Sequence, residues 1–299
     1  MAEAASQAPA ARLPALAVLA FGACVIGLSP ILVRLAETGP AAAGFWRLAI
    51  AAPLLVMLSG RGGGAIGRPS RLGLLAGAFF ALDLGFWHYG IRYTSVANAT
   101  VLSNGAPLVA IAFAWIFLRE RPRALFLLAV AAAIGGAVVM ALAKGGGGLL
   151  NQPLGDALSA STALWYGLYL VCIGQGRRTE DASRLMLWST LSSAPLLLVA
   201  ALLMGESILP AGAGGWAACI GLGLMHVAGQ GSIAWALGRL PTATASVVML
   251  LQPVVAAWLG WLVFVEPIGP LQAFGAAVTL AGVVLAQVAA RPRAQPSSP

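Results

Sequence analysis

Charged residues are scarce in this chain of 299 residues: they make up 9% of it, whereas hydrophobic residues make up 60%. A soluble domain carries about 25% charged residues, because its surface must be polar. This composition, with a mean hydropathy of +0.91, excludes a soluble protein and predicts a chain that lies in a lipid bilayer. The net charge of +8 does not indicate nucleic-acid binding, because the basic residues stand between apolar runs and do not follow one face.

The residue types that support metal binding and catalysis are also few. Cys24, Cys172 and Cys219 all lie within apolar runs, which is typical of small buried hydrophobic residues and not of a disulfide framework. His88 and His226 are too few for a structural zinc site, which takes four ligands. The sequence has no P-loop and no recognisable pair of nucleophile and base. We therefore expect neither an enzyme nor an ATP-driven motor, and no cofactor or metal.

Long uncharged intervals divide the sequence into segments of membrane-spanning length. A spanning helix needs about 20 apolar residues, and eight intervals between consecutive charges reach this length. Two further intervals each contain one ionisable residue, Arg47 or Asp83. Because a backbone in lipid must satisfy its hydrogen bonds internally, we expect an all-α polytopic membrane protein. The ten predicted transmembrane helices are 14–34, 41–59, 71–91, 94–118, 123–143, 155–175, 184–204, 214–237, 242–264 and 268–290.

Basic residues are distributed unequally between the predicted loops. If the N-terminus is cytoplasmic, thirteen arginines lie on the cytoplasmic side, whereas Arg34, Arg92 and Lys144 lie outside. Cytoplasmic loops of membrane proteins carry an excess of Lys and Arg. We therefore expect a multi-pass protein of the inner membrane with both termini in the cytoplasm.

One stretch of the sequence occurs twice. Residues 93–142 match residues 239–288 at an offset of 146 residues, which places Pro107, Trp115 and Glu120 on Pro253, Trp261 and Glu266. Five predicted spans separate the copies, so each helix corresponds to one that runs in the opposite direction. Such inverted-topology repeats place a substrate site near the membrane midplane, between the halves. The predicted parts are a tail 1–12, a five-helix repeat 13–146, a five-helix repeat 147–290 and a tail 291–299.

Several motifs resemble a known family. The run Tyr89-Gly-Ile-Arg-Tyr-Thr-Ser-Val-Ala-Asn-Ala, followed by Pro107 and Leu118-Arg-Glu120, resembles the signature of EamA-type members of the drug/metabolite transporter superfamily. The second half repeats it from Ala236 to Glu266-Pro, and Phe45-Trp46-Arg47 resembles the family's aromatic–arginine start of the second helix. The resemblance implies ten helices and export or exchange of small metabolites, including amino acids. Among the branches, the chain is most similar to aromatic amino-acid exporters.

Arg47 departs from the symmetry of this pattern, because Ser189 stands at its second-half counterpart. Any role of Arg47 is therefore asymmetric. We expect a structural role in which it extends toward the outside, with Glu37 as a possible partner. Glu120 and Glu266 are also predicted to be structural, each at the positive end of the helix that follows it.

Polar residues within spans are costly and tend to face the protein interior. Asp83 is the one acid in the middle of a predicted span; it could couple transport to protons, bind a substrate ammonium or join helices. Trp87 follows at i+4, on the same face, and His88 is next to it. His226 and Gln230 form another i,i+4 pair that could bind solute or hold helices together. The predicted substrate-binding residues are Asp83, Trp87, His88, Asn98, Trp165, Tyr169, His226, Gln230, Trp235 and Gln252.

Prolines interrupt three of the predicted spans. Each proline removes a backbone donor and frees a carbonyl one turn back, which favours a kink or a hinge. The predicted hinges are Pro30, Pro107 and Pro253.

The sequence thus predicts a secondary transporter that works by alternating access, with a central cavity between the first, third, fourth, sixth, eighth and ninth helices. The expected partners are a small-molecule substrate and the lipid bilayer, not nucleic acid, and a monomer suffices for the mechanism. The expected substrate is an amino acid with an aromatic or apolar side chain. The alternatives are another solute, such as a nucleotide-sugar or a drug-like cation, and a membrane scaffold that transports nothing.

Overall fold

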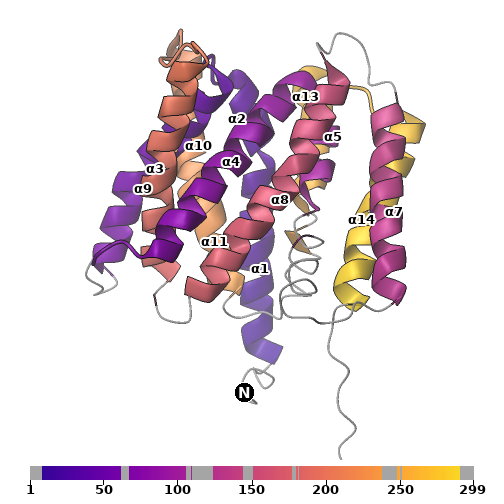
Figure 1. The fold of residues 1–299 in the computed structure, drawn as a ribbon, viewed down its shortest axis with the longest axis horizontal. Helices are drawn as coiled ribbons and strands as arrows, with labels where there is room; N and C mark the ends of the chain where they lie inside the picture. The colour runs from indigo at the N-terminus through magenta and orange to yellow at the C-terminus, as the bar shows by residue number, and fades with distance from the viewer. Residues whose placement is uncertain are drawn as a thin grey trace, which may run out of the picture.

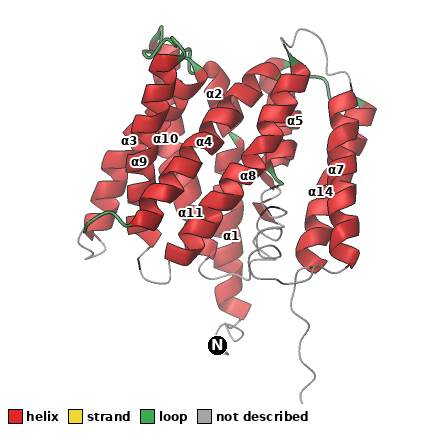
Figure 2. Cartoon of the chain, in the orientation of Figure 1, coloured by secondary structure: helices red, strands yellow, loops and turns green. Residues whose placement is uncertain are grey.

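The chain folds as a bundle of helices in a computed structural model. The structure describes residues 9–61, 67–105, 109, 124–143, 151–176, 180, 182–237, 248–249 and 251–289. Within these ranges there are helices and loops but no strand, as Figure 2 shows. This confirms the predicted all-α class. Pro107, Trp115 and Glu120 lie outside the described residues.

The described helices overlap the predicted segments, but several extend beyond the predicted bounds, and the first begins at Pro9, inside the predicted tail 1–12. Five stretches are long and apolar enough to cross a membrane: Leu13–Leu35, Pro40–Leu58, Arg71–Tyr93, Gln152–Ile173 and Arg184–Leu203. The helices are α1 (Pro9–Gly27), α2 (Ser29–Leu35), α3 (Pro40–Arg61), α4 (Arg71–Tyr93), α5 (Val96–Ser103), α7 (Ala124–Leu142), α8 (Gln152–Gly176), α9 (Ala182–Leu203), α10 (Ala213–Met225), the π-helix η2 (His226–Gln230), α11 (Gly231–Leu237), α13 (Leu251–Phe264) and α14 (Pro270–Ala289).

Helix contacts define two groups of three segments, which we call bundle A and bundle B. Bundle A consists of α4, α5 and α8, which pack on one another. Bundle B consists of α1 with α2, α10 with η2 and α11, and α13, and the first of these segments packs on the other two. Contacts between the bundles include the packing of α13 on α5. The pair α3 and α9 contacts both bundles, and the pair α7 and α14 stands at one side (Figure 1). Each bundle therefore mixes helices from both sequence halves.

Small residues allow the closest helix contacts in bundle A. A Cβ atom on Gly155 would lie 2.6 Å from the backbone nitrogen of Thr94, and one on Gly90 would lie 2.3 Å from Ser159 Oγ. At Gly155 a side chain would meet fixed backbone atoms, and at Gly90 it would displace the Ser159 hydroxyl, because atoms that are not bonded do not approach so closely. The two glycines therefore hold α8 directly against α4.

Local signals in the sequence set the helix ends that position the interior. Ser70 caps α4 by accepting from the Gly73 N–H at 2.9 Å, and Ser95 caps α5 by accepting from the Asn98 N–H at 3.1 Å. A break at Leu28 separates α1 from α2, and Pro30 lies in the first turn of α2. Pro253 is buried in the first turn of α13. The hinge role of Pro30 and Pro253 stays a prediction.

Candidate functional site

Arg47 lies in the interior of the helix bundle. Its residue is 3% exposed, and Nη1 donates a hydrogen bond to Ser29 Oγ at 3.1 Å. It interacts electrostatically with Asp83, across the contact between α3 and α4. The predicted outward extension toward Glu37 is therefore wrong. A guanidinium in a membrane core needs partners, and here they lie inside the bundle.

Asp83 is half-buried on α4, between the buried Ala81 and Leu84. Its interaction with the buried Arg47 places the carboxylate on the inner side of the helix. Arg47 and Asp83 therefore place a guanidinium and a carboxyl group near each other in the interior of the bundle.

Aromatic rings from α4 and α8 form a wall near this charged pair. The ring of Phe80 stacks on Tyr169 with centroids 4.9 Å apart, and Tyr166 stacks on Tyr169 at 5.6 Å. Phe86 contacts the predicted residue Trp165 at 5.9 Å. Flat apolar surfaces of this kind bind rings and apolar side chains.

His226 and Gln230 lie at the two ends of η2. His226 packs on Phe80 at 5.7 Å, and its Nε2 lies 3.4 Å from Thr190 Oγ1. Gln230 forms a hydrogen bond with Tyr166. The prediction that this pair lies on a regular α-helix is wrong, because the segment is a π turn. Single π turns within helices frequently mark functional sites.

Several buried polar atoms of the interior have no hydrogen-bond partner among the described residues. Such atoms are costly unless a ligand, a water or an ion satisfies them. His88 Nδ1 lies 2.9 Å from the carbonyl of Pro40 and donates to it, so Nε2 is left as an acceptor. These unpartnered atoms include Arg47 Nε, Trp87 Nε1, His88 Nε2, Trp165 Nε1 and His226 Nδ1.

Three predicted site residues lie apart from this cluster. Asn98 is fully buried at one end of α5, where its amide bonds to Asp156 and Gln272. Trp235 is 42% exposed on α11. Gln252 is half-buried at the start of α13. The structure therefore brings together Asp83, Trp87, His88, Trp165, Tyr169, His226 and Gln230 on α4, α8 and η2.

A cavity of about 890 Å³ opens at the end of the bundle where α2 and α4 end and α3 begins. We call this the outer end, after the predicted orientation. Arg34, His88, Tyr89, Glu206 and Phe264 contribute to its walls. Because His88 belongs to both the cavity wall and the interior cluster, the cavity lies directly outside the candidate site.

Glu266 also lies at the outer end, and its carboxylate accepts from the Val96 N–H at 2.9 Å. The prediction that Glu266 serves the helix that follows it is therefore wrong. The Glu266 carboxylate does lie at the positive N-terminal end of a helix, but this helix is α5.

Sequence reasoning missed several residues of these regions. Phe80 and Tyr166 complete the aromatic wall; their spacing from Asp83 and Tyr169, by about one helical turn, was the signal that could have found them. Hydrogen bonds between different segments involve Asp156, Glu206 and Gln272. No local sequence pattern predicts such partners. Among the described residues, no group of three His, Cys, Asp or Glu side chains could hold a metal ion.

These features define a polytopic helical membrane protein with a polar, aromatic interior. The sequence model of the EamA-like transporter family matches residues 14–142 and again residues 153–287. The chain therefore belongs to the EamA-like transporter family, and small-molecule transport is its general activity.

Named relatives agree with the family. The chain is 26% identical to the pseudopaline exporter of Pseudomonas aeruginosa, with 82% of each chain covered. It is 25% identical to an uncharacterized transporter of Archaeoglobus fulgidus, over 74% of this chain and 78% of the relative. A solved crystal structure with 17% identity matches with a TM-score of 0.65, over 92% of this chain and 98% of that chain, and shows a shared fold.

Proposed function

We propose that this chain is a secondary transporter that exports or exchanges small metabolites by alternating access, with aromatic or apolar amino acids as its substrates. The observation that carries the proposal is the meeting of Arg47, Asp83 and the aromatic wall inside the bundle. A guanidinium suits the carboxylate of an amino acid, a carboxylate suits its ammonium, and stacked rings suit its side chain.

Ten spans in two inverted halves are part of this proposal. In such a repeat, each helix of the first half has an equivalent in the second half. The first segment (α1 with α2) is equivalent to α8, and α4 is equivalent to the segment made of α10, η2 and α11. The contact of α4 with α8 then matches the contacts of α10 with α2 and of α11 with α1. The contact of α5 with α8 likewise matches those of α13 with α1 and α2. This pairing supports an inverted repeat.

The cavity of the proposed carrier lies between bundle A and bundle B. Rocking of one bundle against the other, with α3 and α9 between them, would expose the interior cluster to each side in turn. Arg47 and Asp83 carry opposite charges, so the site suits a zwitterionic solute, whose carboxylate pairs with Arg47 and whose ammonium pairs with Asp83.

The proposal includes an inner-membrane location with both termini in the cytoplasm. The distribution of arginines supports this orientation. A reporter fused after Pro299 tests it: activity on the cytoplasmic side is expected, and activity only on the outside would refute it.

Counterflow in liposomes tests the transport proposal. Purified protein is reconstituted with unlabelled phenylalanine or tryptophan inside, and uptake of the labelled amino acid is followed against protein-free liposomes. We expect accumulation that unlabelled aromatic amino acids inhibit. A variant with Arg71→Gln serves as a control, because Arg71 is an exposed arginine at the start of α4 and does not line the outer cavity.

A second candidate substrate comes from the named relatives. The similarity to the pseudopaline exporters supports including that solute in the panel, together with a nucleotide-sugar and an organic cation. Flux of pseudopaline without flux of amino acids would replace the proposed substrate. Absence of flux for every solute would favour the scaffold and refute the transporter.

A further inference from the structure

Arg34 and Glu266 join bundle A to bundle B at the outer end. Arg34 belongs to α2 and Glu266 follows α13, so both belong to bundle B, where they form an ion pair. Arg34 Nη2 also donates to the carbonyls of Ile91 at 2.8 Å and Thr94 at 2.7 Å, at the end of α4 in bundle A. The other Glu266 oxygen accepts from the Val96 N–H, at the start of α5 in bundle A. The ion pair therefore holds three backbone groups of the opposite bundle.

The surroundings fix this pair in place. The guanidinium of Arg34 lies 5.0 Å above the ring centre of Phe264, and the side chains of Arg34 and Glu266 are 17% and 18% exposed. Partial burial strengthens a charged pair relative to an exposed one. The position of Glu266 thus depends on the backbone and side chains that end α13.

The backbone beside Glu266 is in an unfavourable conformation. Val265 has a φ of 54°, in the left-handed region that β-branched residues rarely adopt. Such strain persists only where surrounding contacts enforce it, and it is concentrated at switch regions and functional sites. Here the Glu266 N–H donates to the carbonyl of Gly260 at 3.4 Å at the end of α13, and the Glu266 carboxylate bonds to Arg34 and to the Val96 N–H. Val265 therefore turns the chain at the end of α13, where the Glu266 carboxylate reaches bundle A.

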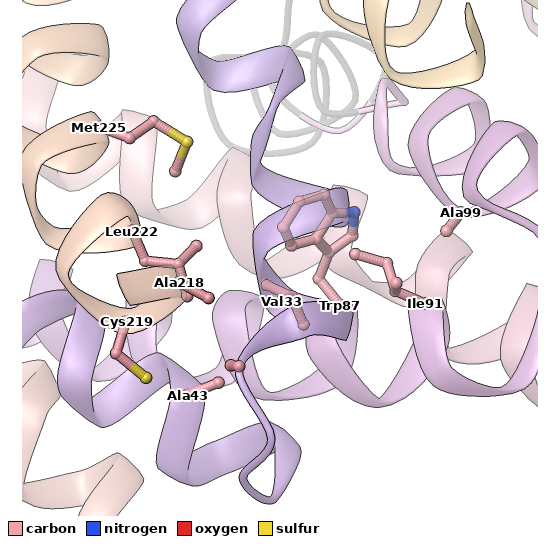
Figure 3. Close-up of a cluster of buried hydrophobic side chains, with 10 residues drawn as sticks. Val33, Ala43, Trp87, Ile91, Ala99, Ala218, Cys219, Leu222 and Met225 are labelled. Atoms are coloured by element: carbon pink, nitrogen blue, oxygen red, sulfur yellow. The ribbon is translucent and has the colours of Figure 1, made fainter. Parts of the chain in front are cut away.

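An apolar cluster lies beneath the pair and separates the outer cavity from the interior. Val33 and Ile91 line the cavity and also belong to a buried cluster with Trp87 and Ala99. Figure 3 shows Val33, Trp87, Ile91 and Ala99 in this cluster. These side chains come from α2 in bundle B and from α4 and α5 in bundle A. Separation of the bundles at the outer end would open this layer.

A neighbouring network joins bundle A to α14. Asp156 accepts from Thr94 Oγ1 at 2.6 Å and from Asn98 Nδ2 at 3.1 Å, and Asn98 Oδ1 accepts from Gln272 of α14. None of these bonds ends in bundle B, so the network does not oppose such a movement. The contacts that must break are those of Arg34 and Glu266, together with the packing of α13 on α5.

We propose that Arg34 and Glu266 form the outer gate of the transporter, closed in this structure, and that their release from bundle A opens the candidate site to the outside. The gate closes through charge-assisted bonds to backbone groups at the ends of α4 and α5, above the layer of Val33, Trp87, Ile91 and Ala99. It rests on alternating access as the mode of transport, but its test needs no solute.

The test measures access to a cysteine placed under the gate. Cys24, Cys172 and Cys219 are replaced by alanine, and Ala99→Cys provides a probe that is fully buried in the closed state. Intact cells are treated with a membrane-impermeant maleimide, and the labelling rate is compared between variants. We expect Glu266→Gln and Arg34→Gln to raise the rate about tenfold or more, because each loses charge-assisted bonds.

Matched controls separate gating from general loss of charge or fold. Glu37→Gln removes an exposed carboxylate of the same cavity and should leave the rate at the parental value. Glu266→Asp keeps the negative charge, so its labelling rate should be close to the parental value. A second probe, Ala201→Cys, lies fully buried in a different cluster and should stay unreactive in every variant.

The gate is refuted if Glu266→Gln labels Ala99→Cys at the parental rate, if Glu37→Gln accelerates labelling equally, or if the Ala201→Cys probe reacts as well. Labelling as expected in a protein that shows no counterflow would refute the proposed substrate and leave the gate intact. The two proposals therefore fail separately.

Discussion

Asn98 Nδ2 lies 3.1 Å from Asp156 Oδ1, and both residues are buried where α5 meets α8. The other side of the Asn98 amide accepts from Gln272 Nε2 at 2.6 Å. Thr94 Oγ1 donates to the same Asp156 oxygen at 2.6 Å. A buried polar network of this kind stabilises a fold when every member is satisfied, and is costly when one member is lost.

The first prediction follows from this network. Asp156→Ala should lower the free energy of unfolding by about 1–3 kcal/mol, because Thr94 and Asn98 would lose their buried acceptor. Denaturant titration of the purified protein in detergent micelles measures the change. Ser207→Ala, at an exposed position of the outer end, should change stability little. Equal stability of the Asp156→Ala variant and the parent would contradict a structural role for this carboxylate.

The second prediction concerns Arg47 as the group that binds a substrate carboxylate. Arg47→Gln should weaken phenylalanine binding about ten- to hundredfold, because a charge-assisted hydrogen bond contributes about 1.5–3 kcal/mol. Phenethylamine lacks the carboxylate, so its competition in counterflow should change much less. The measurement is the ratio of the two inhibition constants in parent and variant. An equal loss for both compounds would show that Arg47 acts through the fold and not through the carboxylate.

Features that are set locally along the chain were predictable from the sequence, whereas contacts between distant segments were not. Uncharged runs of spanning length predicted the helices, because hydrophobicity and backbone hydrogen bonding in lipid act locally along the chain. The polarity of the interior also followed from the cost of Asp83 and His226 in lipid. Which groups meet was harder to predict. Arg47 bonds to Ser29 and Glu266 to the start of α5 because distant segments pack together, and no local pattern encodes that pairing.

Local geometry explains a second difference. The pair His226 and Gln230 was found from helical spacing, yet the segment is a π turn. A π turn accommodates an extra residue, and its cost is offset by tertiary contacts that the sequence does not reveal. The contacts of His226 with Phe80 and of Gln230 with Tyr166 are of this tertiary kind.

The third prediction concerns Asp83 as the partner of a substrate ammonium. Asp83→Asn should weaken phenylalanine binding about tenfold or more and should affect 3-phenylpropionate, which lacks the amine, much less. Counterflow competition with both compounds measures the difference, and the profile of rate against pH tests proton coupling in the same variant. An unchanged rate and an unchanged pH profile in Asp83→Asn would remove both the ammonium role and the coupling role.

The last prediction concerns the π turn itself. Deletion of Ala228, an exposed residue within η2, should convert the turn to continuous α-helix, because π turns differ from α-helix by one added residue. Gln230 would then move by one position relative to His226 and lose its bond to Tyr166. We expect the counterflow rate to fall at least about tenfold. Loss of the hydrogen bond between Gln230 and Tyr166 accounts for a change of this size, because about 1.4 kcal/mol corresponds to a factor of ten. Ala228→Leu keeps the residue count and should transport normally. Thermal unfolding shows whether the shortened helix still folds, and normal transport by a folded deletion variant would show that the π turn has no part in the site.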